Sequence, residues 1–287
     1  MLVLATALLG GCAVPMRTSL TPEVRASIKE LDTRVVVVQD EVIVDVKPST
    51  ATGAGVAFGL VGALITSTID SAVTNNRVKS AQDLMGPFYQ TIEDVDFRKE
   101  MNEAVQPALA GYPIKVGSVT TTMLGLNDAT LRKWRNGLQP GQALMIIVPR
   151  YALSADFRTF DTETVVTMWK KDGDDRPVNR SVLRYQSAPI GPGDKDSVLE
   201  WSADNAAAFR AVVKEAVAET MYLIRTDLDV TDEPIKPEQQ RDFRFNAGHQ
   251  HVVLKGRLIA ETATRVAMLG TDGKMYSLPK PNVVAKN

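Results

Sequence analysis

The sequence predicts an α+β domain in which a mixed or mainly antiparallel sheet packs against helices, followed by a small carboxyl-terminal β unit. Three observations support this prediction. The chain has 287 residues, 44% of them hydrophobic, so it can bury a large core. Segments rich in Val and Thr recur at strand length, and one long segment has apolar residues at helical spacing. Several strand segments follow one another before the long helix, which favours antiparallel neighbours.

The first predicted strand region covers 33–46. It is rich in Val and is interrupted by three polar residues at 39–41, so it predicts either one long strand or two short strands around a turn. Residues 80–110 have a helical pattern with interruptions, and the last helical piece covers 97–109. Both regions belong to the main domain, which is predicted over 33–231.

A strand, a capped helix and a buried strand are predicted next. Residues 114–122 have the composition of a strand. Asn127 can cap a helix over 129–136, because its side-chain oxygen can accept a hydrogen bond from a free amide of the first turn, and Gly137 can end that helix. The continuous apolar run in 143–153 predicts a strand that is buried on both faces.

A hairpin and a long helix complete the predicted main domain. Residues 157–169 and 178–186 have strand composition and flank an Asp-Gly turn, so they predict two paired antiparallel strands. Residues 196–228 place apolar side chains on one helical face and charged side chains, including Glu215 and Glu219, on the other. We expect this helix to lie across the sheet.

The carboxyl-terminal region predicts a linker and a small β unit. Residues 232–247 are polar and contain Pro234 and Pro237, which is typical of a linker. Residues 248–287 contain three strand patterns and an Asp-Gly turn, a unit too small to be stable alone. The strand patterns cover 251–259, 265–269 and 274–278.

The amino terminus has a composition of its own. Residues 1–11 are mostly apolar but too short to span a bilayer, which takes about 20 residues. The motif Leu9-Gly10-Gly11-Cys12 resembles the lipobox of bacterial lipoproteins, where one branched apolar residue and two small ones precede a cysteine. The resemblance implies that the signal peptide 1–11 is removed, that lipid is attached to Cys12, and that residues 12–32 form a tether and lead-in.

The residues around Cys12 refine this expectation. Ala13 follows the cysteine, and the absence of Asp at that position implies release to the outer membrane in the enterobacterial sorting pattern. No Lys or Arg precedes the apolar run, so we expect the true translation start to lie upstream. Cys12 is the single cysteine of the chain, which excludes an intramolecular disulfide and a cysteine-based zinc site as competing roles.

Residues 53–73 carry a ladder of small side chains. Between Lys47 and Asp70 there are 22 uncharged residues, and five small residues recur at every fourth position. On a helix these positions form one stripe, which lets another backbone approach closely. The ladder consists of Gly55, Gly59, Ala63, Ser67 and Ser71.

Three roles fit this ladder: a transmembrane helix, a self-associating helix in a homo-oligomer, and a helix packed within its own domain. The strongly apolar part covers only 56–65, whereas a spanning helix needs about 20 residues. We therefore favour packing within the domain and keep the other two roles as alternatives.

Motifs that indicate catalysis or cofactor binding are absent from the sequence. It has no P-loop, no dinucleotide-binding turn, no G-x-S-x-G and no H-E-x-x-H, so we expect no catalytic residue and no cofactor. His249 and His251 would share one face of a strand and are the only candidate metal ligands of imidazole type. A site would need a third ligand, such as Asp242 or Glu261, so no metal site is predicted.

The charge pattern limits the class of partner. The 33 basic and 34 acidic residues are spread along the chain, so we expect no nucleic-acid partner. The sequence favours a non-enzymatic lipoprotein on the periplasmic face of the outer membrane, an assembly or accessory factor that contacts other envelope proteins. The alternatives are an oligomeric secretion or transport component that uses the helix 55–71, and a periplasmic enzyme or metal-binding protein without a recognisable motif.

Overall fold

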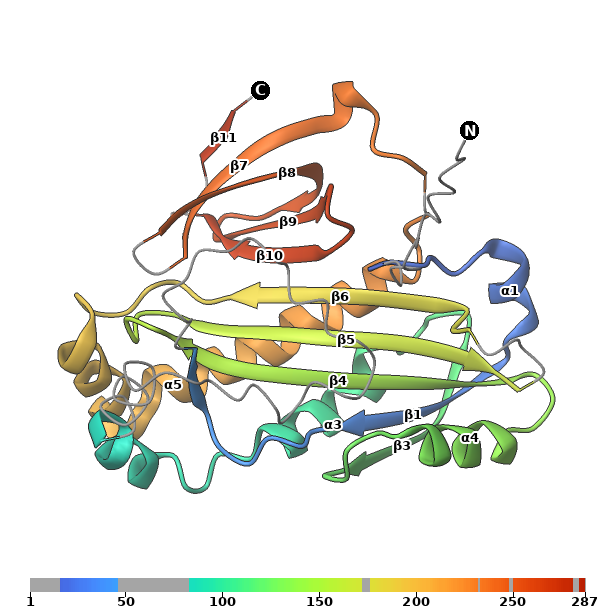
Figure 1. The fold of residues 1–287 in the computed structure, drawn as a ribbon, viewed down its shortest axis with the longest axis horizontal. Coiled ribbons are helices and arrows are strands. Elements are labelled where there is room, and N and C mark those ends of the chain that lie inside the picture. Colours follow the sequence, from blue (N-terminus) through green and yellow to red (C-terminus); the bar gives the residue numbers. More distant parts are fainter. Residues whose placement is uncertain are drawn as a thin grey trace, which may run out of the picture.

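A computed structural model of the chain describes residues 16–45, 83–171, 176–231, 233–247, 250–280 and 284–286. These residues form a mixed sheet of 11 strands with helices packed on it (Figure 1), so the predicted α+β class is confirmed. The strands are β1 (Glu30–Val36), β2 (Ile43–Asp45), β3 (Lys115–Thr122), β4 (Gln142–Ser154), β5 (Phe160–Lys170), β6 (Asn179–Gln186), β7 (Gln240–Ala247), β8 (Gln250–Glu261), β9 (Arg265–Gly270), β10 (Met275–Pro279) and β11 (Val284–Lys286).

The sheet has the order β11-β7-β8-β9-β10-β6-β5-β4-β1-β3, and β2 pairs separately with β4.

The helices are α1 (Pro22–Ser27), a helix over 83–91, α3 (Phe97–Ala108), α4 (Asp128–Gly137), α5 (Asp194–Asp227) and the short 3-10 helix η1 (Pro237–Gln239). Within the described residues, no helix has both the length and the apolar character needed to cross a membrane.

Strand β4 lies in the middle of the main sheet and is buried on both faces, as predicted. Successive side chains of a strand point to opposite faces. Met145 and Ile147 therefore belong to the large core that also contains residues of α3 and α5, whereas Leu144 and Ile146 pack with Leu131 of α4 on the other face. Helices cover both faces, which explains the continuous apolar run of this strand.

The region over 33–46 forms two strands, so the second of the two predicted possibilities is correct. Both β1 and β2 pair in parallel with β4, at different ends of that long strand. Between β1 and β2, the amide side chain of Gln39 makes the hydrogen bonds to the β4 backbone that a paired strand residue would otherwise make. Its Nε2 donates to the Tyr151 carbonyl at 2.6 Å, and its Oε1 accepts from the Tyr151 amide at 3.2 Å.

Helix α5 lies across the sheet as predicted, but it is not continuous. Asp204, Asn205 and Ala206 have φ angles of 51°, 57° and 55°, in the left-handed region, so two helical segments meet at this break. Left-handed backbone costs about 1–2 kcal/mol for each residue with a side chain, although Asp and Asn tolerate it better than most. The sequence pattern predicts a single helix because its apolar spacing continues across the break.

The carboxyl-terminal strands continue the main sheet (Figure 1). Strands β8, β9 and β10 are antiparallel, as predicted, and β10 then pairs in parallel with β6 over Met275 to Ser277. The linker predicted over 232–247 is wrong for its second half, because residues 240–247 form β7. The physical reason is alternation: Phe243 and Phe245 point into a separate core with residues of β9 and β10.

Candidate functional site

Most of the predicted site residues lie outside the described residues. This holds for Cys12, for the ladder from Gly55 to Ser71 and for His249. The backbone of His251 lies in β8, opposite Asn246 of β7. The predicted roles of these residues therefore stay predictions.

The two suggested third metal ligands have other neighbours. Glu261 forms an ion pair of 2.7 Å with Lys280, which lowers the pKa of the Glu261 carboxyl. Asp242 of β7 lies opposite Lys255 of β8, four residues along β7 from the position that faces His251. In the described part of the chain, no group of three His, Cys, Asp or Glu side chains could hold a metal ion.

The amino-terminal segment is bound to the body of the domain. The Nε of Arg17 donates to Oδ1 of Asp227 at 2.9 Å, and its two Nη atoms donate to the carbonyls of Val230 at 2.7 Å and Thr231 at 3.3 Å. The side chains of Arg17 and Asp227 are only 6% and 2% exposed. We call residues 17–29, which lead from this ion pair into β1, the lead-in segment.

Further contacts fix the lead-in segment along its length. Thr18 exchanges two backbone hydrogen bonds with Arg180 of β6, at 2.8 and 2.9 Å. Leu20 is 1% exposed and belongs to the large core, and Arg25 forms an ion pair of 3.0 Å with Asp229. Residues 12–15 of the predicted tether lie outside the described residues, and the residues from 17 onwards are docked, because they contribute a core residue and a buried ion pair.

Asp227 is the centre of this docking site. Its Oδ2 accepts a hydrogen bond from Nδ2 of Asn179 at 3.2 Å, in addition to the Arg17 ion pair. Burial raises the pKa of the Asp227 carboxyl, while the Arg17 guanidinium and the Asn179 amide act in the opposite direction. The end of α5 thus presents a buried carboxylate that is matched to the Arg17 side chain.

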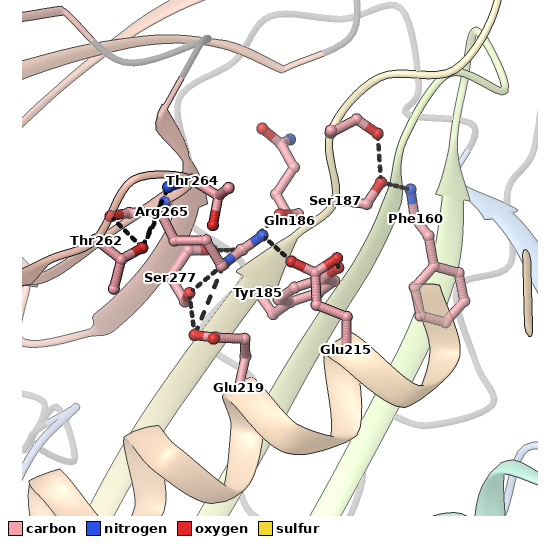
Figure 2. Close-up of polar contacts among 11 residues, drawn as sticks. Phe160, Tyr185, Gln186, Ser187, Glu215, Glu219, Thr262, Thr264, Arg265 and Ser277 are labelled. Carbon is pink, nitrogen blue, oxygen red and sulfur yellow. Dashed lines mark hydrogen bonds and ion pairs between the residues drawn. The ribbon is translucent and has the colours of Figure 1, made fainter. Parts of the chain in front are cut away.

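A second buried arginine joins the carboxyl-terminal strands to α5 (Figure 2). Arg265 of β9 donates from Nη1 to Glu215 at 2.9 Å, and from Nη2 to the carbonyls of Gln186 and Ser277, both at 2.8 Å. The hydroxyl of Ser277 in turn donates to Glu219 at 2.6 Å. We call these five residues the Arg265 network. It connects β6, β9, β10 and α5, so it fixes the carboxyl-terminal strands on the main domain.

A cavity of about 280 Å³ lies beside the middle of α5, where Phe209 and Val213 line it. Its inner wall contains Phe97, Tyr151, Phe160 and Phe209, none of them more than 5% exposed. The rings pack against one another, with 4.3 Å between the centroids of Phe97 and Tyr151 and 5.5 Å between those of Phe160 and Phe209. Exposed carboxylates stand at the mouth: they belong to Asp40, Glu41 and Glu93.

Two tyrosine hydroxyls hold the wall of this cavity in place. The Tyr89 hydroxyl donates to the Val42 carbonyl at 2.7 Å, and the Tyr151 hydroxyl donates to the Gln39 carbonyl at 3.3 Å. Burial raises the pKa of the Tyr151 hydroxyl to about 12. The cavity therefore combines a largely buried aromatic wall with exposed carboxylate acceptors at its mouth.

No protein-family model and no curated protein matches the sequence. The cavity and both arginine sites escape sequence analysis, because their residues come from distant segments and carry no motif.

Proposed function

We propose that the protein is an outer-membrane-anchored lipoprotein that faces the periplasm and acts as a non-enzymatic assembly or accessory factor through protein contacts. The anchor rests on the motif at 9–12. The observation that supports the proposed role near the membrane is the docked lead-in segment, because only four residues separate Cys12 from Arg17. At about 3.6 Å per residue, lipid on Cys12 would lie within about 18 Å of the Arg17 site.

This short distance supports a role close to the membrane surface. Two or three acyl chains anchor a protein stably, because each buried methylene contributes about 0.8 kcal/mol. A domain docked so near to its anchor has little freedom to move away from the bilayer. Such an arrangement suits a factor that acts on other components of the same membrane, rather than one that reaches across the periplasm.

Removal of the cysteine tests the anchor. We expect Cys12→Ser to leave the protein unprocessed by lipidation, without incorporation of labelled palmitate and without the tight outer-membrane association of the wild type. Ala13→Asp is the matched variant: it keeps the lipid but is expected to shift the protein to the inner membrane. Palmitate labelling and membrane fractionation measure both. Wild-type labelling and fractionation of Cys12→Ser would contradict the proposed anchor.

The ladder from Gly55 to Ser71 favours a second candidate, an oligomeric secretion or transport component. Close helix approach requires small residues on the stripe, so Gly59→Leu should prevent it. For this candidate we expect the detergent-solubilised wild type to be a discrete oligomer and Gly59→Leu to be a monomer by light scattering. Val61→Leu, off the stripe, should leave the oligomer intact. A monomeric wild type would contradict this candidate.

A further inference from the structure

We propose that the cavity between Tyr151 and the 37–42 segment binds a small organic cation, a compact amine or quaternary ammonium with an apolar body. This inference does not depend on the lipid anchor. The volume of about 280 Å³ lies just below the usual range of about 300–1,000 Å³ for small-molecule sites, so the ligand must be compact.

The sign of the ligand charge follows from the mouth of the cavity. Asp40 forms an ion pair with Arg98 at 3.1 Å, but Glu41 and Glu93 form no ion pair with any other described residue. No Lys or Arg is among the described residues that line the cavity. Among the described residues these two carboxylates have no counter-charge, and such carboxylates attract a cation and repel an anion, most strongly where low-dielectric walls reduce screening.

The neighbouring acidic residues do not extend this site. Asp94 is bound by Arg210 at 2.6 Å, and Asp96 accepts hydrogen bonds from the amides of Arg98 and Lys99 at the start of α3. Their charges are already matched by a guanidinium or by amide donors. Within the part of the chain that the structure describes, Glu41 and Glu93 are thus the carboxylates at the mouth whose charge is not matched.

The inner wall suits the apolar part of such a cation. Five aromatic side chains line this cavity, and Tyr89 is the one that is partly exposed, whereas the other four are at most 5% exposed and form the floor. Aromatic rings attract ammonium groups through their negative faces within about 6 Å, so the Tyr89 ring is the one that a bound ammonium would reach. The Tyr89 and Tyr151 hydroxyls donate to backbone carbonyls. These hydrogen bonds hold the wall of the cavity, and the hydroxyl protons are not directed at a ligand anion. Since Gln39 also holds the 37–42 segment to Tyr151 by two hydrogen bonds, the wall is formed before a ligand arrives.

A matched pair of compounds tests the proposal on the full-length protein. Choline and its uncharged isostere 3,3-dimethylbutanol have the same shape and differ in the charge, and butylammonium represents primary amines. By calorimetric titration we expect at least one of the two cations to bind at millimolar concentration or below, and the isostere to bind about tenfold more weakly than choline or not at all. Failure of both cations to bind, or equal binding of choline and its isostere, would overturn the proposal.

Variants of the mouth place the binding at this cavity. We expect the double variant Glu41→Gln, Glu93→Gln to bind the cation at least about fivefold more weakly, because both carboxylate charges are lost while the shape of the side chains is kept. Both side chains are exposed, so the variant should fold. Glu238→Gln, an exposed carboxylate of η1, is the control and should bind like the wild type. Cation binding that is unchanged in the double variant would also overturn the proposal.

Discussion

Replacement of Arg265 by leucine is expected to lower the free energy of unfolding by about 2–4 kcal/mol. The substitution removes the donors of two buried carbonyls, those of Gln186 and Ser277, and each unsatisfied buried group costs about 1–3 kcal/mol. It also removes the charged partner of Glu215, which keeps the hydrogen bond from the Tyr185 hydroxyl and is exposed enough for partial rehydration. Urea denaturation measures the loss, and amide hydrogen exchange should increase first in β9 and β10.

Arg184 of β6 provides the control for this prediction. It forms an ion pair with Glu163 on the neighbouring strand, but its side chain is 47% exposed. An exposed pair of this kind contributes at most about 1 kcal/mol, so Arg184→Leu should have a small effect. Equal losses in the two variants would show that the Arg265 network has no special role in fixing the carboxyl-terminal strands.

Replacement of Asp227 by alanine is expected to lower the free energy of unfolding by about 3–5 kcal/mol, because it leaves the buried Arg17 guanidinium without its carboxylate. Asn179 loses an acceptor in the same step. The lead-in segment should then detach more often from the end of α5. Urea denaturation measures the stability, and limited trypsin digestion should show faster cleavage after Arg17.

The charge pair can be separated from packing by a double variant. Well-packed apolar residues often replace a buried ion pair at little cost, so Arg17→Met combined with Asp227→Leu should recover most of the stability lost in Asp227→Ala. The double variant lacks the trypsin site at position 17, so the comparison uses cleavage after Arg25 and Lys29, which should be slower than in Asp227→Ala. A double variant as unstable as the single one would contradict the assignment of the loss to an unpaired buried charge.

The elements that the sequence predicts well are those with a long local pattern. Strands β4, β5 and β6 and the second segment of α5 have apolar residues at a regular spacing over eight or more positions, and the spacing decides the element. Strand β7 was missed although Phe243 and Phe245 alternate with polar residues. Two prolines shortly before β7 and its charged composition favour a linker. The short alternation forms a strand because neighbouring strands supply the core into which the two Phe side chains pack.

The sites could not be predicted in the same way. Glu215 lies on the charged face of its helix, where the pattern predicts exposure to solvent, yet it binds an arginine 50 residues further along the chain. Arg17 and Asp227 are 210 residues apart. No period or motif relates such positions, because the pairing is created by the folded sheet and helices.

For the proposed lipoprotein, the separation between Arg17 and its partners implies an order of events during export. A chain that crossed the membrane amino terminus first would expose the lead-in segment while Asp227, Val230 and Thr231 were still to be translocated. With the proposed anchor, lipid transfer and signal cleavage at Cys12 can therefore act on an undocked substrate. In this proposal, closure of the Arg17 ion pair would come late, and it would draw the finished domain towards the membrane that holds the lipid on Cys12.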